Sequence, residues 1–247
     1  MSKWVEGQVV AKRYWTGQLV SLQVEAAVAP FRAGQFTKLG LDLEGERIER
    51  PYSYVNPPHQ GPLEFYFITV PDGPLTNAMA ALDRGDGLWV QAQPSGLFTL
   101  ADVPDGEDLW LLATGTALGV FLSILQTEEP WERFANVVLV HGVRTVEELT
   151  YRRTLEELAY RRGRQFRMVP FVSREETELG FQGRLTHALT DGRLERHTGL
   201  EIAPGRSQVM ICGNRDMVRD ATSLLTEREL KKNRRSSPGH ITTEHYF

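Results

Sequence analysis

Arg50, Tyr52 and Ser53 place a guanidinium group, a phenol ring and a hydroxyl group within four residues of one another. They lie near the end of a strand-like run, residues 47–55. Because side chains alternate along a strand, Arg50 and Tyr52 should share one face, and Pro51 and Ser53 the other. An arginine forks onto phosphate, a ring stacks on a flat ligand, and a hydroxyl hydrogen-bonds a ring edge. These residues alone fit equally well a site for a flat, phosphorylated ligand and a half-exposed strand with aromatic filler and one surface arginine, and the remainder of the chain has to decide.

A second group of polar residues follows apolar, strand-like segments in the second half of the chain. Residues 114–119 join a strand to a helix with two glycines and two threonines, so the backbone can approach a pyrophosphate there. Arg144, Ser173, Arg174 and Arg184 stand at or just beyond neighbouring strand ends. NADP sites use arginine where NAD sites carry a carboxylate. The pattern predicts a pocket for a 2′-phosphate, and ordinary surface arginines are the alternative.

Cys212 ends another apolar strand, and the chain ends on two aromatic residues, Tyr246 and Phe247. No histidine stands beside Cys212 as an activating base, so we do not expect a thiol nucleophile. The spacing of His240 and His245 lacks matching ligands, so no metal site is expected. The two terminal rings are expected to dock on something flat or apolar.

Residues 1–100 read as a chain of short strands with turn signals between them, which favours an antiparallel barrel or sandwich. A helical insert is predicted over residues 75–82. Its start, residues 72–77, offers either a phosphate cradle or an ordinary helix cap. The strands are expected at residues 5–13, 19–25, 35–43, 47–55, 63–70 and 88–93.

Residues 101–247 alternate apolar strands with helices, which is typical of a parallel sheet covered on both faces. Ligands of such sheets bind at the carboxyl ends of the strands, where the candidate residues lie. The strands are expected at residues 109–113, 136–141, 165–172, 208–212 and 241–247, and the helices at 118–126, 146–162, 185–191 and 216–230.

The chain has 247 residues, of which 41% are hydrophobic and 24% charged, enough for two globular domains. Its net charge of −4 does not suggest non-specific nucleic-acid binding. A single cysteine excludes an internal disulfide and a four-cysteine iron–sulfur cluster. No signal peptide or apolar run of membrane-spanning length is visible. These features predict a soluble, cytoplasmic protein.

Taken together, the motifs resemble those of the ferredoxin–NADP+ reductases, specifically the compact bacterial type that serves ferredoxin or flavodoxin. Residues 50–53 resemble the family's Arg-x-Tyr-Ser motif, residues 212–217 its Cys-Gly-x-x-x-Met segment, and residues 244–246 its Glu-x-Tyr end. The usual Gly-Thr-Gly-x-Ala-Pro reads Gly-Thr-Ala-Leu-Gly-Val over residues 115–120. The resemblance implies an FAD-binding antiparallel β-barrel at residues 1–100. It also implies an NADP-binding parallel-sheet α/β domain at residues 101–247, with the aromatic tail over the flavin.

The resemblance also implies roles for individual residues. Arg50 would hold the FAD pyrophosphate, Tyr52 would pack on the flavin, and Ser53 would lie near flavin N5. The implied catalytic group is Ser53, Cys212, Glu244 and Tyr246. The implied FAD contacts are Arg50, Pro51, Tyr52, Ser53, Tyr66, Phe67, Ile68, Thr69, Gly73, Leu75, Thr76, Thr116, Tyr246 and Phe247. The NADP contacts are Thr116, Arg144, Ser173, Arg174, Arg184, Cys212 and Asn214.

The activity so implied is hydride transfer from NADPH to flavin N5, followed by exchange of single electrons with ferredoxin or flavodoxin. The protein is expected to be a monomer without nucleic-acid or membrane partners. Two alternatives stay open. One is an NADPH-dependent reductase of free flavin or quinone, and the other is a flavin- and NADP-binding sensor without turnover.

Overall fold

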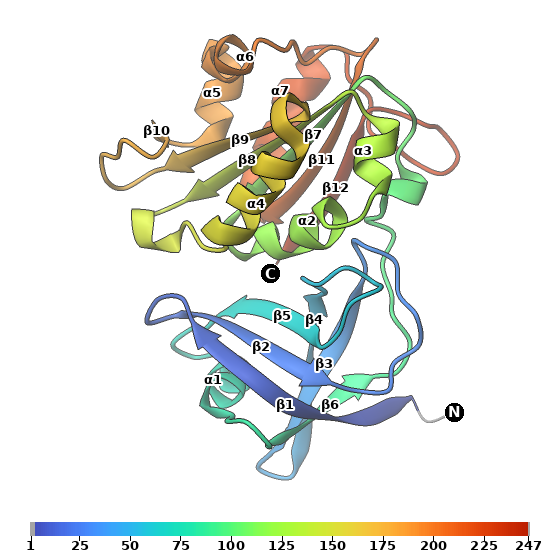
Figure 1. Ribbon diagram of the computed structural model, residues 1–247, viewed down its shortest axis with the longest axis vertical. Coiled ribbons are helices and arrows are strands. Elements are labelled where there is room, and N and C mark those ends of the chain that lie inside the picture. Colours follow the sequence, from blue (N-terminus) through green and yellow to red (C-terminus); the bar gives the residue numbers. More distant parts are fainter. Residues whose placement is uncertain (1–2, 247) are drawn as a thin grey trace. The chain divides into compact units, whose positions relative to one another are not determined.

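The computed structural model describes residues 3–246, which form two compact units (Figure 1). The first unit holds residues 3–99 together with Gly119–Thr127, and the second holds Leu100–Leu118 and residues 128–246. The first change of unit coincides with the composition shift near residue 100. The short return of the chain at Gly119–Thr127 has no such marker in the sequence.

The first unit is a six-stranded antiparallel sheet in the order β4-β3-β6-β1-β2-β5, curled into a half-barrel (Figure 1). This confirms the predicted antiparallel barrel. Its core is apolar, with Val20, Leu22, Phe65, Met79 and Val90 all buried. The elements are β1 (Trp4–Tyr14), β2 (Leu19–Glu25), β3 (Phe36–Leu43), β4 (Glu46–Ser53), β5 (Leu63–Ile68), α1 (Pro74–Ala81) and β6 (Gly87–Gln91).

The β3–β4 hairpin sets the position of the Arg-Pro-Tyr-Ser stretch. Its two-residue loop, Glu44 and Gly45, has φ angles of 50° and 86°. Positive φ at both loop residues is the geometry that matches the twist of paired strands. The register therefore runs without a slip from Leu43 opposite Glu46 to Phe36 opposite Ser53. The hairpin delivers Ser53 to the end of β4 farthest from the turn.

The second unit is a six-stranded parallel sheet in the order β10-β9-β8-β7-β11-β12. Helix α4 lies in front of the sheet and α5 and α7 lie behind it (Figure 1). This confirms the predicted covered parallel sheet. The strands are β7 (Asp108–Thr114), β8 (Asn136–Val143), β9 (Phe166–Val172), β10 (Phe181–Gln182), β11 (Ser207–Asn214) and β12 (Ile241–Tyr246). The helices are α3 (Glu129–Arg133), α4 (Arg152–Arg162), α5 (Leu185–Asp191), α6 (Arg193–Thr198) and α7 (Arg215–Glu227). Helix α2 (Leu118–Leu125) starts at the last residue before the change of unit and belongs to the first unit from Gly119 onward.

One predicted helix, residues 146–162, is wrong over its first turns. Val146–Glu148 is an isolated 3₁₀ turn, and α4 begins only at Arg152. Between them Tyr151 has a left-handed φ of 54°, which interrupts the helix. The cause is Leu149, which is drawn into a small apolar cluster with Val143 and Val172. Burial of that side chain outweighs the local helix preference.

Among residues 3–246, no helix is both long and apolar enough to cross a membrane.

Candidate functional site

The ends of β4 and β5 bring two predicted ligand-binding rings together in the first unit. The rings of Tyr52 and Phe67 meet edge-on, with their centroids 5.9 Å apart. Burial raises the pKa of the Tyr52 phenol to about 12, so the ring is neutral. Arg50 is exposed, and its Nη1 donates to the Glu49 carbonyl oxygen at 2.7 Å. No carboxylate in the described part of the chain forms an ion pair with Arg50, so its guanidinium is available for an anion.

Helix α1 begins without a side-chain cap. Its N-cap residue is Gly73, and Pro74 follows at the first helical position. The hydroxyl of Thr76 donates to the Gly73 carbonyl at 3.2 Å, and the amide of Asn77 donates to Val70 and Pro71 rather than capping the helix. A Cβ at Gly73 would lie 2.3 Å from Val70 Cγ2, so a residue without a side chain is needed for the backbone to lie this close to Val70. The uncapped first turn suits a phosphate group better than the ordinary capped start.

In the second unit, a hydrogen bond joins the end of β11 to the end of β7. The Asn214 N–H donates to the Thr114 hydroxyl at 3.0 Å. Gly213 lies between them with φ of 145°, and a Cβ there would stand 2.1 Å from Thr114 Oγ1. The Asn214 side chain caps α7 by accepting from the Asp216 and Met217 N–H groups. Asn214 therefore has a structural role at this strand end besides its predicted contact with NADP.

We expect Gly213→Ala to lower the free energy of unfolding by about 2 kcal/mol, because the side chain meets both a positive φ and a close hydroxyl. Urea unfolding followed by circular dichroism measures the loss. Thr114→Ala removes the 2.1 Å contact but also the hydroxyl that accepts from Asn214, so the double variant is compared with Thr114→Ala alone. Gly213→Ala should cost less stability in the Thr114→Ala background. An unchanged cost there would assign it to the positive φ and to the 3.0 Å approach to the Thr114 backbone nitrogen.

Cys212 and Glu244 are register partners on β11 and β12. Cys212 is fully buried, and burial together with the Glu244 charge raises the pKa of its thiol well above the usual value, while a hydrogen bond with Tyr246 acts in the opposite direction. Burial raises the pKa of Glu244 to about 7. Glu244 Oε2 is buried and makes no hydrogen bond with any described residue. A neutral thiol and a protonatable carboxyl group therefore lie side by side at this edge of the sheet.

Three predicted arginines gather around the ends of β8, β9 and β10. The Arg174 N–H donates to the Arg144 carbonyl at 2.9 Å, and both the N–H and the hydroxyl of Ser173 donate to the Val143 carbonyl. Arg184 follows Gly183, whose N–H donates to the Val172 carbonyl at 2.8 Å. All three arginines are exposed, and none forms an ion pair within residues 3–246. Two carboxylates also lie at these strand ends, but Glu148 and Glu175 accept from the backbone N–H groups of Arg144 and Val146 and form no ion pair with the three guanidinium groups.

The sequence analysis placed Thr114 in the turn at residues 114–119, but it assigned no role to Thr114 or to His141. Thr114 holds the Asn214 backbone, and the His141 imidazole lies 3.0 Å from the Gly115 carbonyl oxygen. A polar residue at the end of an apolar strand was the available signal for His141. The predicted contact of Phe247 with the adenine lies outside the described residues.

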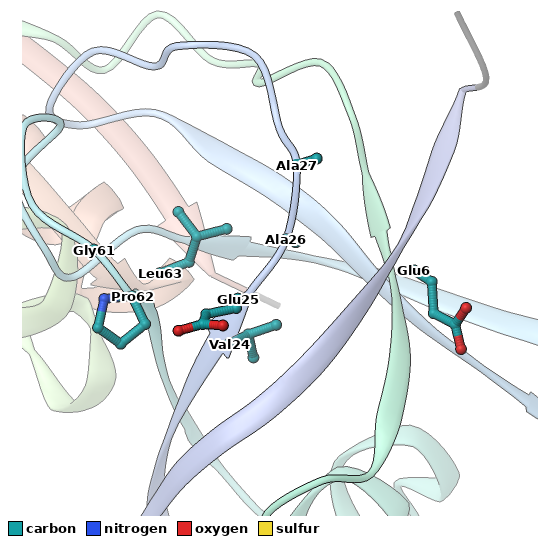
Figure 2. Close-up of a pocket in the computed structure, with 8 residues that line it drawn as sticks. All are labelled: Glu6, Val24, Glu25, Ala26, Ala27, Gly61, Pro62 and Leu63. Atoms are coloured by element: carbon teal, nitrogen blue, oxygen red, sulfur yellow. The ribbon is translucent and has the colours of Figure 1, made fainter.

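A shallow groove of about 500 Å³ on the first unit contains none of the predicted site residues (Figure 2). Val24, Pro62 and Leu63 form its apolar part, and Glu6 and Glu25 bring two carboxylates. Carboxylates repel the phosphates of a dinucleotide, so this groove is not where such a ligand is expected.

Comparisons with known proteins agree with this arrangement. Residues 111–223 match the oxidoreductase NAD-binding domain family. Flavodoxin/ferredoxin–NADP reductases of Shigella flexneri and Escherichia coli (strain K12) are each 48% identical to this chain over 248 residues, covering the whole of both proteins. A ferredoxin NADP+ reductase from Neisseria gonorrhoeae, whose crystal structure holds FAD and NADP, is 30% identical and superposes with a TM-score of 0.93 over the full length of both chains. The chain therefore belongs to the flavodoxin/ferredoxin–NADP reductase family.

Proposed function

We propose that this protein is an FAD-dependent oxidoreductase that exchanges electrons between NADPH and a one-electron carrier, ferredoxin or flavodoxin. The observation that carries the proposal is the set of residues at the carboxyl ends of the strands of the parallel sheet. There the buried Cys212 and the half-buried Glu244 lie near the ends of β11 and β12, and Arg144 and Arg174, which form no ion pair with a described residue, lie at the ends of β8 and β9. Full-length similarity to reductases of this name supports the same conclusion.

The first unit suits FAD. Arg50 has no competing carboxylate in the described chain and would hold a phosphate, and the open first turn of α1 at Leu75 and Thr76 offers further N–H donors. The paired rings of Tyr52 and Phe67 would border the flavin. FAD held there would supply a flavin ring that can take up a hydride at N5 and release its electrons singly, which is chemistry that side chains cannot provide. The residues of this unit bind and orient the ring.

The second unit suits NADP. Arg144, Arg174 and Arg184 would bind the 2′-phosphate, since none of them forms an ion pair with a described residue. Nothing lies within 4 Å of a Cβ built on Gly115, which leaves open space beside the backbone that leads to Thr116. We place the nicotinamide half of the cofactor beside this turn and Cys212.

Glu244 and Cys212 have different tasks at the reacting end. Cys212 stays a thiol at neutral pH and presents a small uncharged surface. Glu244 changes protonation near pH 7 and would hold a proton at its carboxyl group. Ser53 and Tyr246 would orient the flavin ring. We also propose that the protein acts as a monomer in the cytoplasm, in keeping with its single cysteine.

The purified protein is expected to be yellow and to lose its flavin absorbance within seconds of adding NADPH, but to respond poorly to NADH. A colourless protein would refute the FAD assignment, and a yellow protein that does not bleach would indicate a sensor. Ferredoxins and flavodoxins purified from the same cell, assayed with NADPH as donor, identify the carrier. Turnover with free flavin or quinone but with none of these carriers would favour the other reductase class.

A further inference from the structure

His141 is a buried titratable residue to which the proposed mechanism assigns no task. His141 is fully buried near the end of β8, a strand that is otherwise apolar along its centre. It is the register partner of Ala113 on β7, and Ala113 is in turn the partner of Cys212 on β11. Register partners in a parallel sheet point to the same face. His141, Ala113, Cys212 and Glu244 therefore form one row across the sheet, at the edge proposed to bind the nicotinamide.

The imidazole of His141 makes one hydrogen bond, which fixes its tautomer. Nε2 lies 3.0 Å from the Gly115 carbonyl oxygen. A carbonyl oxygen only accepts, so Nε2 must carry the proton and Nδ1 must be the unprotonated nitrogen. Burial lowers the pKa of the imidazole to about 4, which keeps this neutral donor form present at pH 7.

The other nitrogen makes His141 a costly choice for packing alone. Nδ1 is buried and makes no hydrogen bond with any described residue. A buried acceptor without a donor costs about 1–3 kcal/mol. Leucine or phenylalanine would fill the same space without that cost, so the bond from Nε2 to Gly115 is the feature that explains a histidine here.

The Gly115 carbonyl group accepts two hydrogen bonds that hold the turn containing Thr116. It accepts both from His141 and from the Leu118 N–H at the start of α2. Gly115 has a left-handed φ of 55°. The peptide group between Gly115 and Thr116 is therefore held by a hydrogen bond from His141 on β8. The Thr114 hydroxyl is held in turn by the Asn214 N–H on the neighbouring strand, β11.

We infer that His141 is a positioning residue, which holds the Gly115 peptide so that Thr116 and the open space beside Gly115 meet the nicotinamide ring in a reactive arrangement. This inference rests on the proposed function. Loss of the bond leaves the arginines and the strand ends unchanged, so it should affect hydride transfer far more than anchoring of the 2′-phosphate.

The test compares His141→Leu, which removes the donor, with His141→Gln, which places an amide N–H near the position of Nε2. The first measurement is the rate constant for flavin bleaching by NADPH in a single turnover of the FAD-loaded protein. We expect His141→Leu to slow it about tenfold or more, and His141→Gln to slow it less than about threefold. The second measurement is the Kd of 2′-phospho-AMP, which reports on the arginines and should stay at the native value in both variants.

Leu139→Val is the matched control. Leu139 is fully buried and lies two residues before His141 on β8, so it is on the same face of the strand, but its side chain cannot donate to the Gly115 carbonyl. Its bleaching rate is expected to be native. Equal rates for native and His141→Leu proteins, or equal slowing by leucine and glutamine, would overturn the inference. A native protein that NADPH does not bleach would instead refute the proposed function.

A measurement on the native FAD-loaded protein keeps the inference testable if His141→Leu does not fold. Nitrogen-15 NMR should find His141 as the neutral Nε2–H tautomer at pH 7, with signals that shift when NADP+ is added. The Nδ1–H tautomer, or signals that NADP+ leaves unmoved, would contradict the positioning role.

Discussion

Replacing Arg144 and Arg174 together by alanine is expected to lower kcat/KM for NADPH about a hundredfold or more, while kcat/KM for NADH stays close to native. Each charge-assisted hydrogen bond contributes about 1.5–3 kcal/mol, and every 1.4 kcal/mol is a factor of about ten. NADH lacks the 2′-phosphate, so it makes neither contact. Steady-state assays with both nucleotides and one artificial oxidant give the two values directly.

A control for lost charge is available in the same unit. Arg161 at the end of α4 and Arg164 in the turn before β9 are both exposed. They lie near the amino end of β9, whereas Arg144 and Arg174 lie at the carboxyl ends of their strands. Replacing this pair by alanine removes the same charge and should leave the NADPH preference unchanged. If the two double variants behave alike, the preference comes from long-range charge. An equal loss for NADPH and NADH in the first variant would argue against a 2′-phosphate site at Arg144 and Arg174.

The architecture could be predicted because its signals are local. Period-two alternation and turn residues predicted the antiparallel strands, and apolar strands between helices predicted the parallel sheet. Short elements escaped prediction. Helix α6 is only six residues long and lies between Gly192 and Gly199, both with positive φ, so the flanking glycines were the clearer mark. The wrong start of α4 has a tertiary cause, the burial of Leu149 against Val143 and Val172.

The candidate site was predicted as a set of strand ends and not as a set of contacts. Because parallel strands end at one edge, the sequence could place Arg144 and Cys212 at the same edge of the sheet. It could not supply the register of β11 against β12, which pairs Cys212 with Glu244. The same holds for the bond from His141 to Gly115, which depends on how a turn folds back over β8. Such pairings join distant segments, and no local pattern encodes them.

Glu244→Gln is expected to stabilise the protein at alkaline pH by up to about 3 kcal/mol, and to have little effect near pH 4. Burial raises the pKa of Glu244 from 4.5 to about 7, and each unit of difference is about 1.4 kcal/mol. The folded state therefore holds the proton more tightly than the unfolded chain. The native protein should lose stability as pH rises from about 4.5 to about 7, and a glutamine cannot ionise.

Urea unfolding at a series of pH values, with FAD at one saturating concentration for both proteins, measures the difference. Glu227→Gln is the control, because Glu227 is an exposed carboxylate at the end of α7 in the same unit. Surface changes of that kind are usually within about 0.5 kcal/mol, and no pH window is expected. A constant offset between Glu244→Gln and native proteins would mean that Glu244 ionises in the folded state as it does in water. A difference that opens between pH 4.5 and 7 would instead place a carboxyl group that retains its proton near neutral pH beside Cys212, as the proposed role of Glu244 requires.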